Sequence, residues 1–320
     1  MTARQPHPQV RALLERAARA PLPAYHTVAP FVARRIYRDT RAALSPAAQP
    51  VAEARLLVAE GTVALRAYRP AGVDPQERLP ALVYFHGGGW TIGDIDTHDP
   101  LCRQLSNGAR CAVFSVDYRL APEYPFPAAL DDCIVATSWV ARQAAELAID
   151  ERRIAVGGDS AGGNLAAVVA LHARDRGAPA LAFQLLIYPA TDQRCGFESH
   201  RTNGEGYLLT REAIEFFRGC YLPRREDWQD WRASPLLAGS LTGLPEALVL
   251  TAGFDPLRDE GRAFADRLVA EGGAAQYVEF EDMVHGFILF GGVLETANVA
   301  VARCCDALKR AFAQVSKGKP

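Results

Sequence analysis

The sequence has little of several features that mark particular classes of protein. It contains no apolar run of about 18 residues, so no transmembrane helix is predicted. Lys plus Arg number 35 and Asp plus Glu number 37, so no basic field favours nucleic acid or an anionic membrane. The first residues, up to Pro8, lack the apolar stretch of a signal peptide. We therefore expect neither nucleic acid nor a membrane as a partner.

Cysteine is present, but in no pattern that indicates disulfides or a metal site. The chain has seven cysteines, an odd number, and no Cys-x-x-Cys. This usage favours reduced thiols and a cytoplasmic location. The composition is 49% hydrophobic and 22% charged, which excludes a disordered chain and indicates an ordinary globular one.

Short apolar runs alternate with amphipathic patterns through most of the 320 residues. The apolar runs predict strands at 79–85, 111–118, 154–157, 181–188, 247–252 and 276–280. Helical patterns lie between them, at 99–108, 127–147, 161–176, 257–271 and 294–314. This alternation predicts an α/β fold with a mostly parallel sheet covered on both faces. Two earlier strands, 53–59 and 62–68, predict a hairpin at the N-terminal edge of that sheet.

Two segments depart from the alternation. Residues 1–50 are rich in proline and hold two short helical patterns that cannot form a core alone. Residues 191–245 follow a core strand but have the pattern of a loop, a helix and a second loop. Thr210 is placed to cap that helix, and its apolar face carries Ala213, Ile214, Phe217 and Tyr221. Ligand sites of α/β sheets lie beyond the carboxyl ends of strands, so the insertion is expected near the site.

The sequence Gly158-Asp159-Ser160-Ala161-Gly162 provides the sharpest chemical signal. It lies between a predicted strand and a predicted helix, where Gly-x-Ser-x-Gly is typical of a nucleophile elbow. Small residues two positions either side let the strand and the helix approach closely. The serine then stands at a helix N-terminus, whose dipole favours developing negative charge. Ser160 is therefore the candidate nucleophile.

A serine hydroxyl needs a base that takes its proton and an acid that orients the base. Where the serine stands in a nucleophile elbow of this kind, the acid and then the base follow it along the chain. His285 is the only one of the seven histidines that follows every predicted core strand, so it is the candidate base. Asp255 follows the strand at 247–252 and is the candidate acid. Asp192 is the second choice for the acid, and Asp282 is a further alternative. Asp259 and Glu260 are also close by, but we assign both to the charged first turn of a helix.

A run of three glycines, Gly87 to Gly89, follows the strand at 79–85. Glycines leave backbone N–H groups unshielded, as an oxyanion hole requires, and the N–H of Ala161 is a further candidate donor. His86, which precedes the glycines, is interpreted as a brace for this loop.

Taken together, these motifs resemble the hormone-sensitive-lipase-like family of α/β-hydrolase esterases. The resemblance spans about residues 80–290 and rests further on Asp117–Glu123, Ser234-Pro235-Leu236 and His285-Gly286-Phe287. It implies a triad of Ser160, Asp255 and His285, with an oxyanion hole formed by Gly88, Gly89 and Ala161. It also implies a helical cap formed by residues 1–50 and 191–235, over a core formed by 51–190 and 236–320.

The expected reaction is hydrolysis of short- to medium-chain carboxylic esters through an acyl-enzyme, with no metal or organic cofactor. Two alternatives remain open: an amidase or deacetylase with the same triad, and a receptor that binds small molecules without turnover. The strand at 276–280 is the last predicted strand, so it is expected at a sheet edge, where a second copy of the chain can pair.

Overall fold

A mixed sheet of eight strands runs through the part of the chain described by the computed structural model, residues 4–316. Its strands are β1 (Glu53–Ala59), β2 (Val63–Arg69), β3 (Leu79–Phe85), β4 (Ala112–Val116), β5 (Ile149–Asp159), β6 (Phe183–Ile187), β7 (Ala247–Phe254) and β8 (Ala275–Val284). Their order is β1-β2-β4-β3-β5-β6-β7-β8. The β1–β2 and β2–β4 pairs are antiparallel and all other pairs are parallel, which confirms the predicted fold class.

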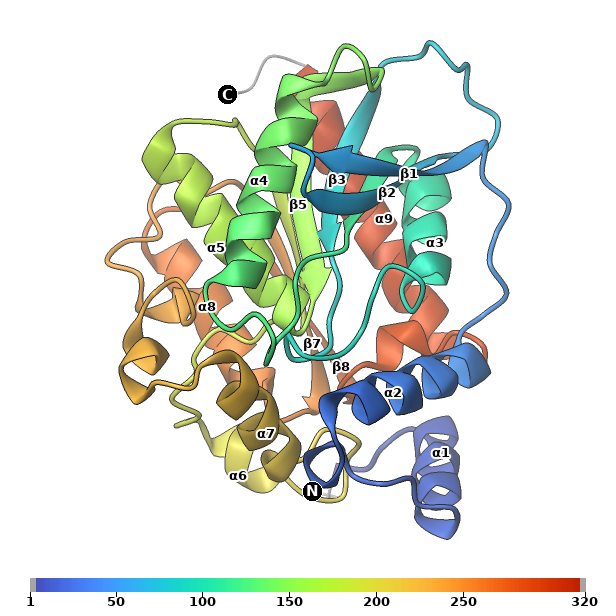
Figure 1. The fold of residues 1–320 in the computed structure, drawn as a ribbon, viewed down its shortest axis with the longest axis vertical. Helices are drawn as coiled ribbons and strands as arrows, with labels where there is room; N and C mark the ends of the chain where they lie inside the picture. The colour runs from blue at the N-terminus through green and yellow to red at the C-terminus, as the bar shows by residue number, and fades with distance from the viewer. Residues whose placement is uncertain (1–3, 317–320) are drawn as a thin grey trace.

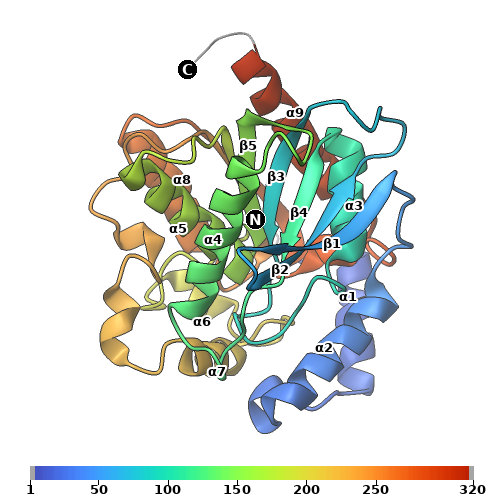
Figure 2. The ribbon, with the colours of Figure 1, turned by 45° about the horizontal axis from the view of Figure 1, so that its top comes forward.

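Helices cover both faces of this sheet (Figures 1 and 2). On one face lie α4 (Ala128–Arg142), α5 (Ala161–Arg176) and α8 (Arg258–Ala270), and on the other lie α3 (Asp99–Ala109) and α9 (Glu295–Ser316). Successive strand residues point to opposite faces, so Val83 and Phe85 pack in one apolar cluster while Leu82 and Tyr84 pack in the other. The strands are buried by both layers, which is why they appeared as continuous apolar runs.

The central strand β5 begins five residues earlier than its apolar run predicts. Ile149 is fully buried and pairs with Leu79 of β3, but Glu151 and Arg152 are exposed. The pairing of β5 with β3 thus begins before a charged, exposed stretch at the end of the sheet, where hydrophobicity does not predict a strand.

The remaining helices lie together at the end of the sheet where the parallel strands finish (Figure 1). These are α1 (Pro8–Arg19), α2 (Pro30–Leu44), α6 (Glu198–Thr202) and α7 (Arg211–Tyr221), with short 3₁₀ turns at Tyr25–Thr27, Arg225–Gln229, Pro235–Leu237 and Phe287–Leu289. We call residues 8–44 and 191–235 the cap segments. As predicted, the Thr210 hydroxyl caps α7 by accepting the Ala213 N–H at 3.3 Å. None of the helices in residues 4–316 has the length and apolarity needed to cross a bilayer.

Candidate active site

The carboxyl ends of three parallel strands bring Ser160, Asp255 and His285 together. They follow β5, β7 and β8 respectively, so residues far apart in the sequence meet at one edge of the sheet. His285 Nε2 lies 2.9 Å from Ser160 Oγ, and His285 Nδ1 lies 2.7 Å from Asp255 Oδ2. Both distances allow a hydrogen bond, so the imidazole bridges the hydroxyl and the carboxylate.

Ser160 occupies a strained turn between β5 and α5. Its φ of 56° and ψ of −117° are rarely adopted by a residue with a side chain, and such strain clusters at functional sites. Close approach of the backbone explains the flanking glycines: a Cβ at Gly158 would overlap the Gly162 backbone, and one at Gly162 would overlap the Phe85 carbonyl. The turn therefore has the geometry that the pentapeptide predicts.

Asp255 is fully buried and its carboxylate is held from both sides. Oδ1 accepts the Leu257 N–H at 2.8 Å, while Oδ2 faces His285. This contact fixes the imidazole so that Nδ1 carries its proton toward Asp255 and Nε2 faces the hydroxyl.

Three of the four alternative acids, Asp192, Asp259 and Glu260, pair with other residues. Asp192 pairs with Arg194 at 2.7 Å, and Asp259 pairs with Arg258 at 2.7 Å. Glu260 lies in the first turn of α8, as predicted, but its buried side chain points to another segment of the chain, which the sequence did not predict. Its Oε2 lies 2.7 Å from His200 Nε2, and its Oε1 accepts the Thr191 N–H at 2.6 Å.

Two glycines of the run after β3, Gly88 and Gly89, line the same cavity as Ser160. Gly88 and Gly89 have φ values of 123° and 56°, in the region that favours glycine. A Cβ at Gly88 would overlap the Ile92 carbonyl, and one at Gly89 would overlap the Phe217 ring of α7. Neither glycine donates its N–H to an acceptor within the described residues, so both donors are free for a ligand.

A buried polar network lies behind the glycine run. Asp159 Oδ1 accepts the Gly87 N–H at 3.0 Å and the Tyr84 hydroxyl at 2.8 Å, and it lies 3.2 Å from His98 Nε2. Burial alone would raise the pKa of Asp159, but the charge of His98 and these hydrogen bonds lower it to about 2. The carboxylate therefore stays ionised and holds the start of the loop.

Sequence reasoning missed the role of His98, because no motif links it to Asp159 across 61 residues. His86, by contrast, has the environment of the predicted brace. It is fully buried, and its ring stacks on Tyr118 at 4.2 Å. Burial and the neighbouring His98 lower the pKa of His86 to about 4, so it is neutral near pH 7.

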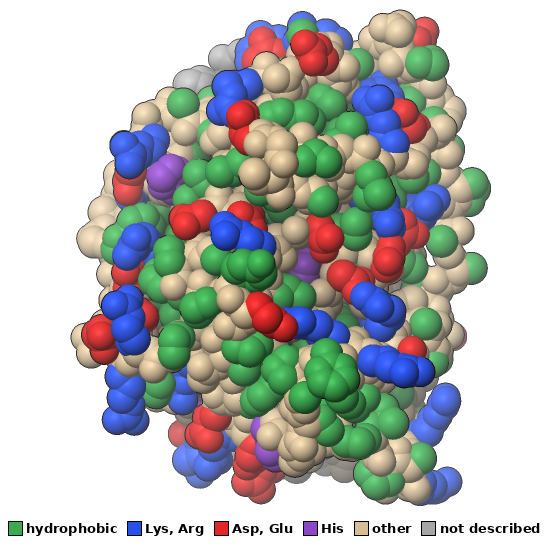
Figure 3. Space-filling model, viewed as in Figure 1, with side chains coloured by type: hydrophobic (Ala, Val, Ile, Leu, Met, Phe, Trp, Pro, Cys, Tyr) green, Lys and Arg blue, Asp and Glu red, His purple; other side chains and the backbone are tan. Residues whose placement is uncertain are grey.

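A cavity of about 530 Å³ opens between the cap segments and the core, and Ser160 and His285 line it. Most of its wall is apolar, with side chains contributed by α1, α2 and α7. In Figure 3, hydrophobic side chains gather low on the molecule, between α7 and α2. This volume is that of a site for a small organic molecule with apolar parts.

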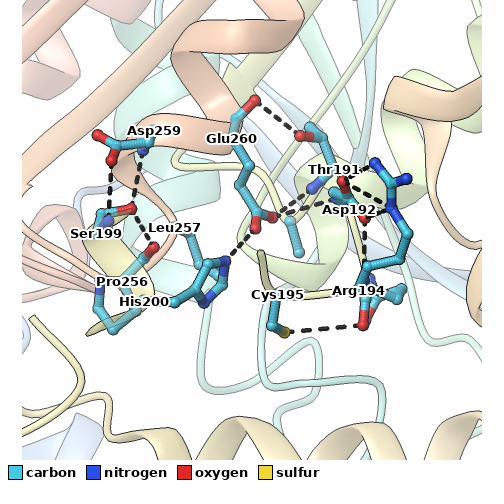
Figure 4. Close-up of polar contacts among 12 residues, drawn as sticks. Thr191, Asp192, Arg194, Cys195, Ser199, His200, Pro256, Leu257, Asp259 and Glu260 are labelled. Carbon is cyan, nitrogen blue, oxygen red and sulfur yellow. Dashed lines mark hydrogen bonds and ion pairs between the residues drawn. The ribbon is translucent and has the colours of Figure 1, made fainter. Parts of the chain in front are cut away.

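The second cap segment, residues 191–235, forms polar contacts with the start of α8 in the core (Figure 4). His200 of α6 pairs with Glu260, and the Ser199 hydroxyl donates to the Pro256 carbonyl at 2.6 Å. The Ser199 N–H donates to Asp259 at 2.9 Å. Burial raises the pKa of Glu260. Besides its contact with His200, this carboxyl group accepts the backbone N–H groups of Thr191 and Asp192. These bonds fix the insertion beside the residues that line the cavity.

Known proteins resemble the chain in both sequence and structure. A family described by its alpha/beta hydrolase fold matches residues 82–289. The carboxylesterase NlhH of Mycobacterium tuberculosis is 45% identical over 253 residues, 78% of this chain and 79% of that protein. Ethyl acetate hydrolase of Pseudomonas putida is 37% identical over 290 residues, 89% and 91% of the two chains. A solved α/β hydrolase from the metagenome of Lake Arreo, Spain, has a TM-score of 0.92 and 42% identity, covering 97% of this chain and 99% of that one.

Proposed function

We propose, since this chain belongs to the hormone-sensitive-lipase-like carboxylesterases of the α/β-hydrolase fold, that Ser160, His285 and Asp255 are its catalytic triad. The protein is a serine hydrolase of carboxylic esters. The observation that carries the assignment is the continuous contact from Asp255 through His285 to Ser160.

In the acylation step, Ser160 Oγ forms a bond to the acyl carbon as its proton moves to His285 Nε2. The carbonyl oxygen becomes an oxyanion, and we assign its stabilisation to the N–H groups of Gly88, Gly89 and Ala161. These donors are fixed before the reaction, so they favour the transition state without reorganising. His285 then returns the proton to the alcohol oxygen as the ester C–O bond breaks.

In the deacylation step, water replaces the alcohol. His285 takes a proton from the water, whose oxygen attacks the acyl carbon of the acyl-serine. Collapse of the second oxyanion releases the carboxylic acid, and Ser160 recovers its proton. The carboxylate of Asp255 stabilises the imidazolium that forms in each step. We propose that the reaction needs no metal or organic cofactor.

Ser160→Ala tests the assignment. We expect the variant to fold but to lose at least about a thousandfold in kcat on p-nitrophenyl butyrate, because removing the nucleophile of a triad abolishes its covalent route. A serine-directed phosphonate should label the wild type and not the variant. Ser240→Ala is the matched control, because Ser240 is exposed and contacts Glu271 away from the cavity. A Ser160→Ala enzyme with more than about a hundredth of the wild-type rate would contradict the assignment.

The cavity also supports a proposal about substrate size. We propose that residues 1–50 and 191–235 form a cap over a core of 51–190 and 236–320, and that this cap limits the acyl group to short or medium length. The short, proline-interrupted elements of the cap segments support a fixed roof rather than a long amphipathic lid that opens on lipid.

We further propose homodimers that pair through β8, and a cytoplasmic location. The position of β8 at the end of the strand order supports pairing, because its outer edge carries N–H and C=O groups that a second copy can satisfy. The seven cysteines are all free, which favours a reducing compartment. Light scattering at micromolar concentration tests the first proposal, with a purely monomeric mass contradicting it. Fractionation of cells tests the second, with recovery outside the cytoplasm contradicting it.

A further inference from the structure

Arg41 of α2 is a cation inside the substrate cavity without an anionic partner. It is the only Arg or Lys among the described residues that line this cavity. Its Nε and Nη1 atoms are buried and have no hydrogen-bond partner, and its guanidinium forms no ion pair within residues 4–316. Buried donors are almost always satisfied, so a pair of unsatisfied N–H groups in a ligand cavity needs an explanation.

The aromatic neighbours of Arg41 leave its buried Nε and Nη1 without an acceptor, although the Tyr37 side chain forms a hydrogen bond with the guanidinium. The guanidinium carbon lies 4.4 Å from the centre of the Tyr37 ring and 4.6 Å from that of Phe290. These contacts position the cation and favour its charge, but ring faces accept no conventional hydrogen bond. Burial outweighs the attraction of Arg41 and raises the pKa of Tyr37 to about 12, and it also raises the pKa of Tyr25. Both phenols therefore stay neutral near pH 7.

The acidic groups that line the same cavity are engaged with other residues. Asp159 pairs with His98, Asp192 with Arg194, and Glu260 with His200. The cavity thus contains one positive group whose charge is not matched from within the protein. Because the guanidinium keeps its proton, an anionic group on a ligand can supply the balancing charge.

The guanidinium is also close to the proposed catalytic centre. A Cβ at Gly286 would lie 3.5 Å from Arg41 Nη2, and Gly286 directly follows His285. An ester bound at Ser160 therefore shares the cavity with the cation, and a negative group on its acyl or alcohol part can reach it.

We propose that Arg41 is a specificity residue that binds a carboxylate on the substrate, so that the natural esters include anionic ones. This inference rests on the proposed function of Ser160. Arginine suits the role because charge-assisted hydrogen bonds to a carboxylate are stronger than neutral ones, and the apolar wall around Arg41 strengthens them further.

The experiment compares two matched esters at pH 8. The p-nitrophenyl hexanoate and the mono-p-nitrophenyl ester of adipic acid have acyl chains of equal length and differ in a terminal methyl or carboxylate. A second pair, p-tolyl acetate and 4-acetoxybenzoate, places the same difference on the alcohol. For each pair, the readout is the ratio of kcat/KM for the anionic ester to that for the neutral ester.

In at least one pair, Arg41→Met should lower this ratio about tenfold or more, equivalent to about 1.4 kcal/mol. Arg41→Lys, which keeps the charge, should retain an intermediate ratio. Arg35→Met is the control on the same helix, because Arg35 is 85% exposed and does not line the cavity; its ratio should match the wild type. Loosening of the cap would slow both esters of a pair and leave the ratio unchanged.

Each other outcome overturns the inference. Ratios that change less than twofold in both pairs would show that Arg41 only supports the cap. An equal fall in Arg35→Met would show a long-range effect of net charge rather than a binding site. These results are distinct from failure of the proposed function, in which the neutral esters would be turned over equally by wild type and Ser160→Ala.

Discussion

At the scale of single residues, two adjacent glycines of the run after β3 are required for different reasons. Gly88 must lack a side chain because its Cβ would meet backbone, the carbonyl of Ile92. Gly89 must lack one because its Cβ would meet the Phe217 ring, which belongs to the cap segments. Gly89 therefore sets both the position of an N–H donor and the distance between the core and α7.

Gly89→Ala should reduce kcat on p-nitrophenyl butyrate by about a hundredfold. The methyl group must displace either Phe217 or the loop, and loss of one oxyanion donor typically costs about 2.7–4 kcal/mol. Gly72→Ala is the matched control: its φ of 71° is close to the 56° of Gly89, but a Cβ there meets no atom within 4 Å. Steady-state kinetics on both variants gives the comparison. Equal losses would show that backbone strain, and not the contact with Phe217, explains the effect.

At the scale of elements, α8 joins the core to the cap insertion. It begins at Arg258, directly after the loop that carries Asp255, and Glu260 in its first turn reaches His200 of α6 (Figure 4). Glu260 is 1% exposed, so its hydrogen bonds to the Thr191 N–H and to His200 are shielded from water. The first turn of α8 thus links the loop that carries Asp255 to residues 191–202.

Glu260→Ala should lower the free energy of unfolding by about 3–5 kcal/mol, because it leaves the buried His200 and the Thr191 N–H without an acceptor. Asp266→Ala is the control in the same helix. Asp266 is 67% exposed, and its pair with Arg262 at 3.6 Å is a surface pair worth at most about 1 kcal/mol. Urea denaturation measures both. A Glu260→Ala variant as stable as Asp266→Ala would mean that water replaces the carboxylate.

At the scale of the whole molecule, the cap segments lie at the end of the sheet where the parallel strands finish (Figure 1). Side chains from these segments and from the core line one cavity, together with Ser160 and His285. A cavity of about 530 Å³ has a definite limit on the acyl chain that it can bury. Some apolar side chains of the cap segments remain exposed, such as Leu22 in the loop after α1 and Phe31 in the first turn of α2.

The rate on p-nitrophenyl esters should rise with acyl length and then fall once the cavity is full. Each buried methylene contributes about 0.8 kcal/mol until then, and further carbons stay in water or clash. Initial rates from acetate to palmitate, below and above the solubility limit of each ester, provide the measurement. A maximum on emulsified long-chain esters, with a jump in rate when the interface forms, would identify a true lipase instead.

The sequence by itself determined the features that depend on local order. Alternating apolar runs predicted the parallel sheet, and Gly158 to Gly162 predicted the turn at Ser160, because a strand, a tight turn and a helix are each specified by adjacent residues. His285 and Asp255 could be chosen from chain order, since parallel strands bring their carboxyl ends to one edge. The start of β5 was not predicted, because the exposed, charged residues near the beginning of this strand carry no hydrophobic signal.

Only the tertiary structure decided which polar groups meet across long separations. Glu260 had the sequence context of a helix first turn, yet it pairs with a histidine 60 residues away. His98 and Arg41 belong to no sequence motif, and their roles depend on burial. His98 is buried in contact with Asp159, while Arg41 lines the cavity and has no anionic partner among the described residues. Burial and pairing are properties of packed surfaces rather than of neighbours in the chain, so a single sequence does not display them.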